Sequence, residues 1–219
     1  MNPLRYPTAL VAITLFALTS AVPADEHAAS LGSAESLARL QEGNQRYVAA
    51  KVTEGKPVAV RRAEVAQAQH PFAIVVGCAD SRTAPELLFD QNLGDLFVVR
   101  SAGNLVDDHA LGSIEYAVAH LGARLIVVLG HERCGAVAAA IASDTAPGHI
   151  NSIVHDIHPA VEAVKGHPGD ALANTVLENA KEVAGKIRSE AKLGDLGSQV
   201  RIVSAVYDLD TGVVDWSKE

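Results

Sequence analysis

The hydrophobic positions of this chain alternate between short aliphatic runs and longer segments whose apolar residues recur at helical spacing. Aliphatic runs of this kind are typical of strands buried on both faces of a sheet. They predict strands at Phe72–Gly77, Asp95–Arg100, Arg124–Gly130 and Val200–Tyr207. Helical spacing predicts helices at Ser33–Ala50, Pro85–Asp90, Asp108–Leu121, Gly135–Ser143, Ile150–Lys165 and Ala171–Leu193. This alternation indicates an α/β fold: a single domain with a mostly parallel β-sheet flanked by helices.

A helical N-terminal arm, residues 33–62, is expected to precede the sheet. Its first part carries Leu37, Leu40 and Tyr47 near helical spacing. The stretch Val52–Arg62 contains a glycine and a proline, so we expect a loop there. At the other end of the chain, a turn is expected over Asp208–Gly212, after the last strand.

The first 24 residues have the pattern of a secretory signal peptide. Arg5 precedes an apolar core over Ala9–Val22, and Val22-Pro23-Ala24 offers a small-residue cleavage site. The apolar core is short for a bilayer span, and acidic residues rather than basic ones follow it. We therefore expect an exported protein, periplasmic or secreted, with no stable membrane insertion. Residues 25–32 would form a linker to the domain at 33–219.

The charge balance excludes one broad class of partner. The formal net charge is −8 at pH 7, and aromatic residues make up only 4% of the chain. Loss of the signal would bring the net charge to about −9. Nucleic-acid binding needs a basic surface and favours aromatic stacking platforms. We therefore expect no nucleic-acid partner.

Two short motifs carry the candidate chemistry, and each directly follows a predicted strand. They are Cys78-Ala79-Asp80-Ser81-Arg82 and His131-Glu132-Arg133-Cys134, and they contain both cysteines of the chain. The carboxyl ends of parallel strands are where ligands gather in open α/β sheets. Two thiolates and one imidazole suit Zn²⁺ and leave a fourth position for chemistry.

Two alternatives bear on this zinc site. In an oxidising compartment, Cys78 and Cys134 could instead form a disulfide. We favour the metal, because a structural disulfide has no need of His131, Asp80 or Arg82 as neighbours. Asp80 is ambiguous: as a fourth ligand it would close the site, whereas paired with Arg82 it would leave the metal open.

The motif Cys-Ala-Asp-Ser-Arg followed by His-x-x-Cys-Gly resembles that of the β-class carbonic anhydrases. The resemblance extends to the segments 40–48, 95–100, 112–118 and 206–212, in the same order and with similar spacing. It implies the reversible hydration of carbon dioxide to bicarbonate by a zinc-bound hydroxide. The alternative within the same fold is the hydrolysis of carbonyl sulfide or carbon disulfide. An alternative from another class is a zinc- or bicarbonate-binding protein without catalysis.

The resemblance also implies roles for residues at the zinc. Cys78, His131 and Cys134 would ligate one Zn²⁺ per chain. Asp80 and Arg82 would form a dyad that holds the hydroxide, and Asp80 would be able to move onto the zinc at lower pH.

Substrate, proton and regulatory roles follow from the same resemblance. Gln69 would orient the substrate, Phe97, Ala102 and Tyr116 would line the carbon dioxide pocket, and Tyr116 with His120 would relay protons. His120 could equally be an ordinary surface histidine. Arg100 and Tyr207 match a second, non-catalytic bicarbonate site, but Val75 stands where that site has a tryptophan. In the family the N-terminal arm wraps a second subunit, so a homodimer or tetramer is expected.

Overall fold

The described part of the chain is built on one five-stranded sheet. The computed structural model describes residues 31–53 and 55–217, so the expected export signal lies outside the described residues. The strands are β1 (Ala73–Cys78), β2 (Leu96–Ser101), β3 (Leu125–His131), β4 (Arg201–Tyr207) and β5 (Val214–Trp216). They lie in the order β2-β1-β3-β4-β5. The first four are parallel and β5 runs antiparallel to β4, which confirms the mostly parallel sheet.

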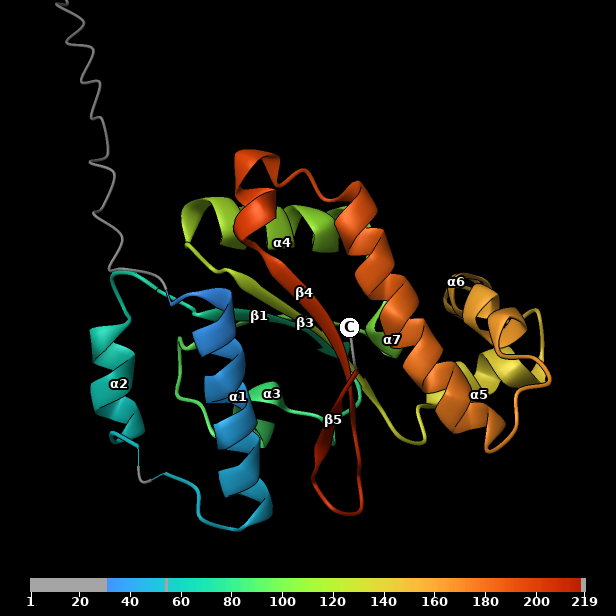
Figure 1. Ribbon diagram of the computed structural model, residues 1–219, viewed down its shortest axis with the longest axis horizontal. Coiled ribbons are helices and arrows are strands. Elements are labelled where there is room, and N and C mark those ends of the chain that lie inside the picture. The colour runs from blue at the N-terminus through green and yellow to red at the C-terminus, as the bar shows by residue number, and fades with distance from the viewer. Residues whose placement is uncertain (1–30, 54, 218–219) are drawn as a thin grey trace, which may run out of the picture.

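Helices flank this sheet on both faces (Figure 1). They are α1 (Ser33–Val48), α2 (Val58–Glu64), α3 (Pro85–Leu88), α4 (Asp108–His120), α5 (Gly135–Ala142), α6 (Ile150–Ala163) and α7 (Ala171–Glu190). Two short 3₁₀ segments, η1 (Ala102–Asn104) and η2 (Gly194–Gln199), complete the described elements. The N-termini of α4 and α7 are capped by Asp107 and Asp170, each of which accepts a backbone hydrogen bond.

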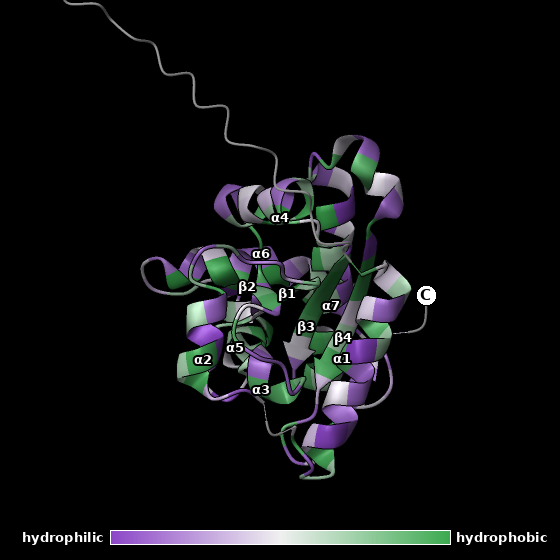
Figure 2. Cartoon of the chain, turned by 90° about the vertical axis from the view of Figure 1, so that its left-hand side faces the viewer, coloured by the Kyte–Doolittle hydropathy of each residue, from purple (hydrophilic) through white to green (hydrophobic). Residues whose placement is uncertain are grey.

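Three apolar clusters form the core. One face of the sheet packs against α4 and α7, through Ile126, Val128 and residues such as Ile114 and Ile187. The opposite face packs against α1 and α3. A third cluster, with α5 and α6, surrounds Cys78 and Cys134. Figure 2 shows the hydrophobic strands enclosed between helices whose outer sides are more polar.

The structure corrects the expected loop over Val52–Arg62. Its second half belongs to α2, a seven-residue helix that begins after Pro57 and runs to Glu64. None of its residues is buried, so it leaves no apolar periodicity in the sequence. Strand β5 was also not predicted, because its three residues are shorter than the runs that indicate a strand.

The first helix packs on the sheet of its own chain. Leu40 is fully buried in the core beneath α1. The Asn44 amide donates to the carbonyl of Gly212 at 2.8 Å and accepts from the backbone of Val214 at 2.9 Å. These contacts tie α1 to the β4–β5 turn. Within the described residues, no helix combines the length and the apolar character needed to cross a membrane.

Candidate metal centre

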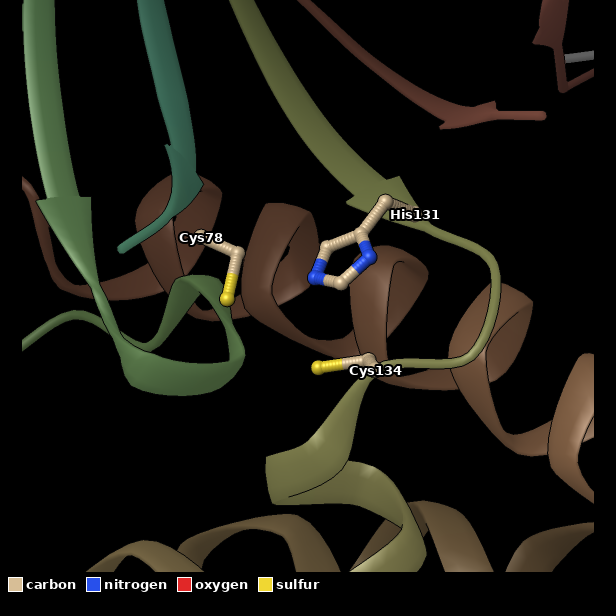
Figure 3. A group of neighbouring side chains, drawn as sticks. All are labelled: Cys78, His131 and Cys134. Carbon is tan, nitrogen blue, oxygen red and sulfur yellow. The ribbon is translucent and has the colours of Figure 1, made fainter. Parts of the chain in front are cut away.

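Three potential metal ligands meet at the carboxyl edge of the sheet. Cys78 is the last residue of β1 and His131 the last residue of β3, and these two strands are parallel neighbours. Cys134 directly precedes α5. Their ligand atoms lie within 4.8 Å of one another, and all three residues are buried. In Figure 3 the two sulfur atoms and the imidazole ring face a common space.

A tight turn returns the chain from His131 to Cys134. Arg133 has a φ of 50°, in the left-handed region that non-glycine residues rarely adopt. Its guanidinium donates two hydrogen bonds to the Asp210 carboxylate, at 2.8 and 2.9 Å. This bidentate contact holds the strained turn against the β4–β5 turn.

The hydrogen bonding of His131 prepares its Nε2 for a metal. Nδ1 lies 2.8 Å from the backbone carbonyl of Glu132. Because a carbonyl only accepts, Nδ1 must carry a proton, and in the neutral imidazole Nε2 then presents its lone pair. Nε2 is buried and has no hydrogen-bond partner among the residues that the structure describes. Buried polar atoms are rarely left unpaired, and a metal ion would satisfy this one.

The two cysteines also fit a metal. Both are free, so the described structure contains no Cys78–Cys134 disulfide. Contact with the Cys134 thiol lowers the pKa of Cys78, and the backbone N–H of Gly103 donates to the Cys78 Sγ at 3.4 Å. The same contact raises the pKa of Cys134, and burial raises it further. Burial opposes the protonation of His131, but the neighbouring Cys78 raises its pKa overall. The donor set of two sulfurs and one nitrogen suits Zn²⁺.

Asp80 lies beside this cluster and is engaged by Arg82. Its carboxylate accepts from Arg82 Nε at 2.9 Å, from Nη2 at 2.7 Å and from the Arg82 backbone at 3.0 Å. The side-chain hydrogen bond from Arg82 holds the pKa of Asp80 well below its usual range. One carboxylate oxygen is 3.8 Å from His131 Nε2. The structure thus places the Asp80–Arg82 pair next to the three potential ligands.

The two residues expected at a second bicarbonate site have other partners. Arg100 donates to the backbone carbonyls of Cys78 and Asp80. The hydroxyl of Tyr207 lies 3.3 Å from that of Tyr47. Val75 is fully buried, and its aliphatic side chain offers no polar group.

Four of the expected site residues lie away from this cluster in the same chain. Gln69 is exposed and precedes the amino end of β1, whereas Cys78 closes its carboxyl end. The strand alone spans about 17 Å at ~3.3 Å per residue. Phe97 is the second residue of β2. Tyr116 and His120, whose ring centroids are 5.1 Å apart, lie in the last turns of α4, close to the start of β3. Ala102, in contrast, precedes the Gly103 that contacts Cys78.

Sequence reasoning missed several groups that shape the site. These are the Gly103 backbone, the Arg133–Asp210 pair and the contacts of Arg100 with the 78–80 backbone. None has a local signature, because each contact joins segments that are distant in sequence. The Gly103 contact alone could have been suspected, since the 3₁₀ turn directly follows a strand that pairs with β1.

The comparisons with known proteins agree with this geometry. A family profile described as "Carbonic anhydrase" matches residues 73–214. Carbonic anhydrase 2 of Mycobacterium tuberculosis is 39% identical over 189 residues, which cover 79% of this chain and 87% of that protein. A carbonic anhydrase of Mycolicibacterium smegmatis is 48% identical over 126 residues, covering 56% of this chain and 61% of that protein.

Solved structures show the same fold. The β-carbonic anhydrase of Coccomyxa, solved in complex with acetazolamide, superposes with a TM-score of 0.66 and 29% identity. The match covers 82% of this chain and 85% of that one. The chain therefore belongs to the β class of the carbonic anhydrase family and is an enzyme of that class.

Proposed function

We propose that this chain catalyses the zinc-dependent, reversible hydration of carbon dioxide to bicarbonate. The observation that carries the proposal is the buried Cys78–His131–Cys134 cluster beside the Asp80–Arg82 pair. Within the described part of the chain, His131 Nε2 has no hydrogen-bond partner. These three side chains would hold one Zn²⁺ per chain. When bound, zinc supplies the Lewis acidity that lets water ionise near neutral pH.

The surrounding residues would orient the reaction. Asp80 is ionised at neutral pH, and Arg82 lowers its pKa further, so its carboxylate can only accept hydrogen bonds. It would accept the hydrogen of the attacking oxygen and thereby turn a lone pair toward the substrate carbon. Arg82 would keep Asp80 from becoming a fourth metal ligand. The apolar cluster around Cys78 and Cys134 would limit competing water.

A second copy of the chain would complete the site. Phe97 lies in the amino half of β2, an edge strand of the sheet, and Gln69 and Tyr116 lie near the amino ends of β1 and β3. If two β2 edges pair antiparallel about a two-fold axis, the amino end of one lies beside the carboxyl end of the other. This pairing would carry the three residues, and His120 with them, toward the partner's metal site. We therefore propose a homodimer or a dimer-based tetramer.

Stopped-flow carbon dioxide hydration on protein of known zinc content tests the activity. We expect turnover to be faster at pH ~8.5 than at pH ~7, because the water that zinc activates is less ionised at the lower pH. We expect no turnover in Cys134→Ser, which lacks one of the proposed metal ligands. Zinc at one per chain without turnover on carbon dioxide, but with turnover on carbonyl sulfide or carbon disulfide, would move the activity to the sulfur analogues. Full zinc with no turnover on any of them would contradict catalysis.

From the signal-like pattern of residues 1–24, we propose a periplasmic or secreted location. The intact mass of the protein recovered from the cell envelope and medium tests this. We expect the protein to lack the mass of residues 1–24, because the signal would be cleaved on export. Full-length protein confined to the cytoplasm would contradict export.

A further inference from the structure

Arg100 bonds the backbone that carries the first metal ligand. It lies on β2, one residue before Ser101, which pairs with Cys78 of β1. Its Nε donates to the carbonyl of Cys78 at 2.8 Å, and its Nη2 donates to the carbonyl of Asp80 at 2.6 Å. The Thr83 hydroxyl lies 3.5 Å from the same Nη2. One edge of the guanidinium therefore spans the segment 78–80.

Few other groups stabilise these two carbonyls. The Asp80 carbonyl also accepts from the Thr83 backbone at 3.1 Å and from the Thr83 hydroxyl at 3.0 Å. The Cys78 carbonyl has only the Thr83 hydroxyl, at 3.4 Å, as an additional donor among the described contacts. Arg100 is the one charged donor in this group, and charge-assisted hydrogen bonds are the stronger ones.

The same segment must hold two side chains in different directions. The Cys78 sulfur faces the metal cluster, while the Asp80 carboxylate meets Arg82. Both directions follow from the backbone conformation of residues 78–80. The backbone N–H of Ala79 donates to Ser101 at 2.9 Å, so β2 supplies backbone as well as side-chain support.

We propose that Arg100 is a positioning residue, which fixes the segment 78–80 so that Asp80 and Cys78 are presented together, and is not an anion ligand. The proposal rests on the proposed function for its kinetic consequence. The Nε–Nη2 edge of the guanidinium, one of the two edges that could bind a carboxylate-like anion through two hydrogen bonds, is already bound to backbone carbonyls. Tyr207 faces the Tyr47 hydroxyl, and Val75 has no donor to offer.

Amide hydrogen exchange on the metal-free protein tests the positioning role without activity. In Arg100→Met, we expect exchange of residues 79–83 to accelerate by about 10-fold or more, with the rest of the sheet unchanged. Arg100→Lys keeps the positive charge, but a lysine ammonium would bond at most one of the two carbonyls. We therefore expect an exchange rate between those of wild type and Arg100→Met.

A matched control is available on the opposite side of the fold. Arg124 also donates to two backbone carbonyls, those of Val118 and Ala123, at 2.9 and 3.0 Å. Arg124→Met should speed exchange near those residues and leave residues 79–83 protected. In the zinc-loaded protein, Arg100→Met should lower kcat about 10-fold with KM within about twofold, whereas Arg124→Met should leave both unchanged.

Three outcomes would overturn the proposal. Unchanged exchange at residues 79–83, with loss of bicarbonate inhibition in Arg100→Met, would make Arg100 an anion ligand. Faster exchange throughout the sheet, in both Arg100→Met and Arg100→Lys, would reduce its role to general stability. If Arg100→Met exchanges faster at residues 79–83 but keeps its kcat, the positioning of this segment does not affect catalysis. A wild-type protein without hydration activity would contradict the proposed function, while the exchange data would still decide the role of Arg100 in the segment.

Discussion

The Asp80 carboxylate accepts hydrogen bonds from both the side chain and the backbone of Arg82. A spacing of two residues makes this possible, because the turn after β1 brings the two groups onto one side. Neither residue is among the three potential metal ligands. Loss of either one should therefore separate metal binding from catalysis.

We predict that Asp80→Asn and Arg82→Ala each keep about one zinc per chain but lose at least ~100-fold in kcat. The carboxylate acceptor is lost in the first variant, and its orientation is lost in the second. Zinc analysis and stopped-flow hydration give the two readouts. Asp156→Asn, an exposed carboxylate paired only with His155 among the described contacts, serves as the control. Wild-type rates in either dyad variant would refute these roles.

Asp90 is a second carboxylate whose protonation matters, because it should lower the free energy of unfolding. Burial alone would raise its pKa, but hydrogen bonds from Arg46, at 2.6 Å, and from Thr53 lower it overall. A lowered folded-state pKa means that this stabilisation is fully present above the unfolded value of about 3.9. It is lost as the pH falls through the lower, folded-state value.

We predict that Asp90→Asn lowers the free energy of unfolding by about 1–3 kcal/mol at pH ~7. Asparagine tolerates the φ of 48° at this position, so the change tests charge rather than backbone strain. Urea unfolding of metal-free protein measures the difference from wild type. That difference should shrink below pH ~4, and a difference constant with pH would contradict the assignment.

At the scale of elements, α1 approaches α3 at a glycine. A Cβ on Gly43 would lie 1.8 Å from the carbonyl oxygen of Phe89, a backbone atom that cannot move independently. The close approach lets Asn44 reach the Gly212 carbonyl and the Val214 N–H. The contact of α1 with the sheet therefore depends on the absence of a side chain at this position.

We predict that Gly43→Ala lowers the free energy of unfolding by more than about 2 kcal/mol. The matched control is Gly185→Ala in α7, where an added Cβ meets nothing within 4 Å. That change should stabilise the protein by about 0.5–1 kcal/mol, because alanine favours a helix. Urea unfolding of both variants decides the point, and equal effects would contradict the packing argument.

On the scale of the whole molecule, the residues expected at the site fall into two groups. Cys78, Asp80, His131 and Cys134 meet at the carboxyl edge of the sheet. Gln69, Phe97, Tyr116 and His120 lie toward the other end, near the amino ends of β1, β2 and β3. If two chains pair about a two-fold axis, the second group of each chain would lie beside the potential metal ligands of its partner.

A mixed dimer tests this arrangement. We predict that a heterodimer of one Cys134→Ser chain and one Gln69→Ala chain, purified through two different tags, recovers about half of wild-type activity. One of its two sites then has intact metal ligands and an intact Gln69 from the partner. If each chain used its own Gln69, the heterodimer would instead have half of the low activity of Gln69→Ala. A monomer at assay concentration would also contradict the proposal.

The sequence by itself determined the parallel strands, most of the helices and the two motifs that carry the potential metal ligands. Four strands were located to within one residue, because a continuous aliphatic run is a local property of the chain. The motifs were visible because Cys78 and Asp80, like His131 and Cys134, are close along the chain. The helix α2 and the strand β5 were not visible, since short elements leave little periodicity.

Only the tertiary structure decided how these pieces act together. The order of strands places β3 beside β1, and that neighbourhood brings His131 to Cys78. The same fold fixes the proton on His131 Nδ1 and directs Arg100 to the 78–80 backbone. It also places Gln69 at the far end of β1 from Cys78, one of the potential metal ligands. These features depend on contacts between residues distant in sequence, and a hydrophobic pattern carries no information about which distant segments become neighbours.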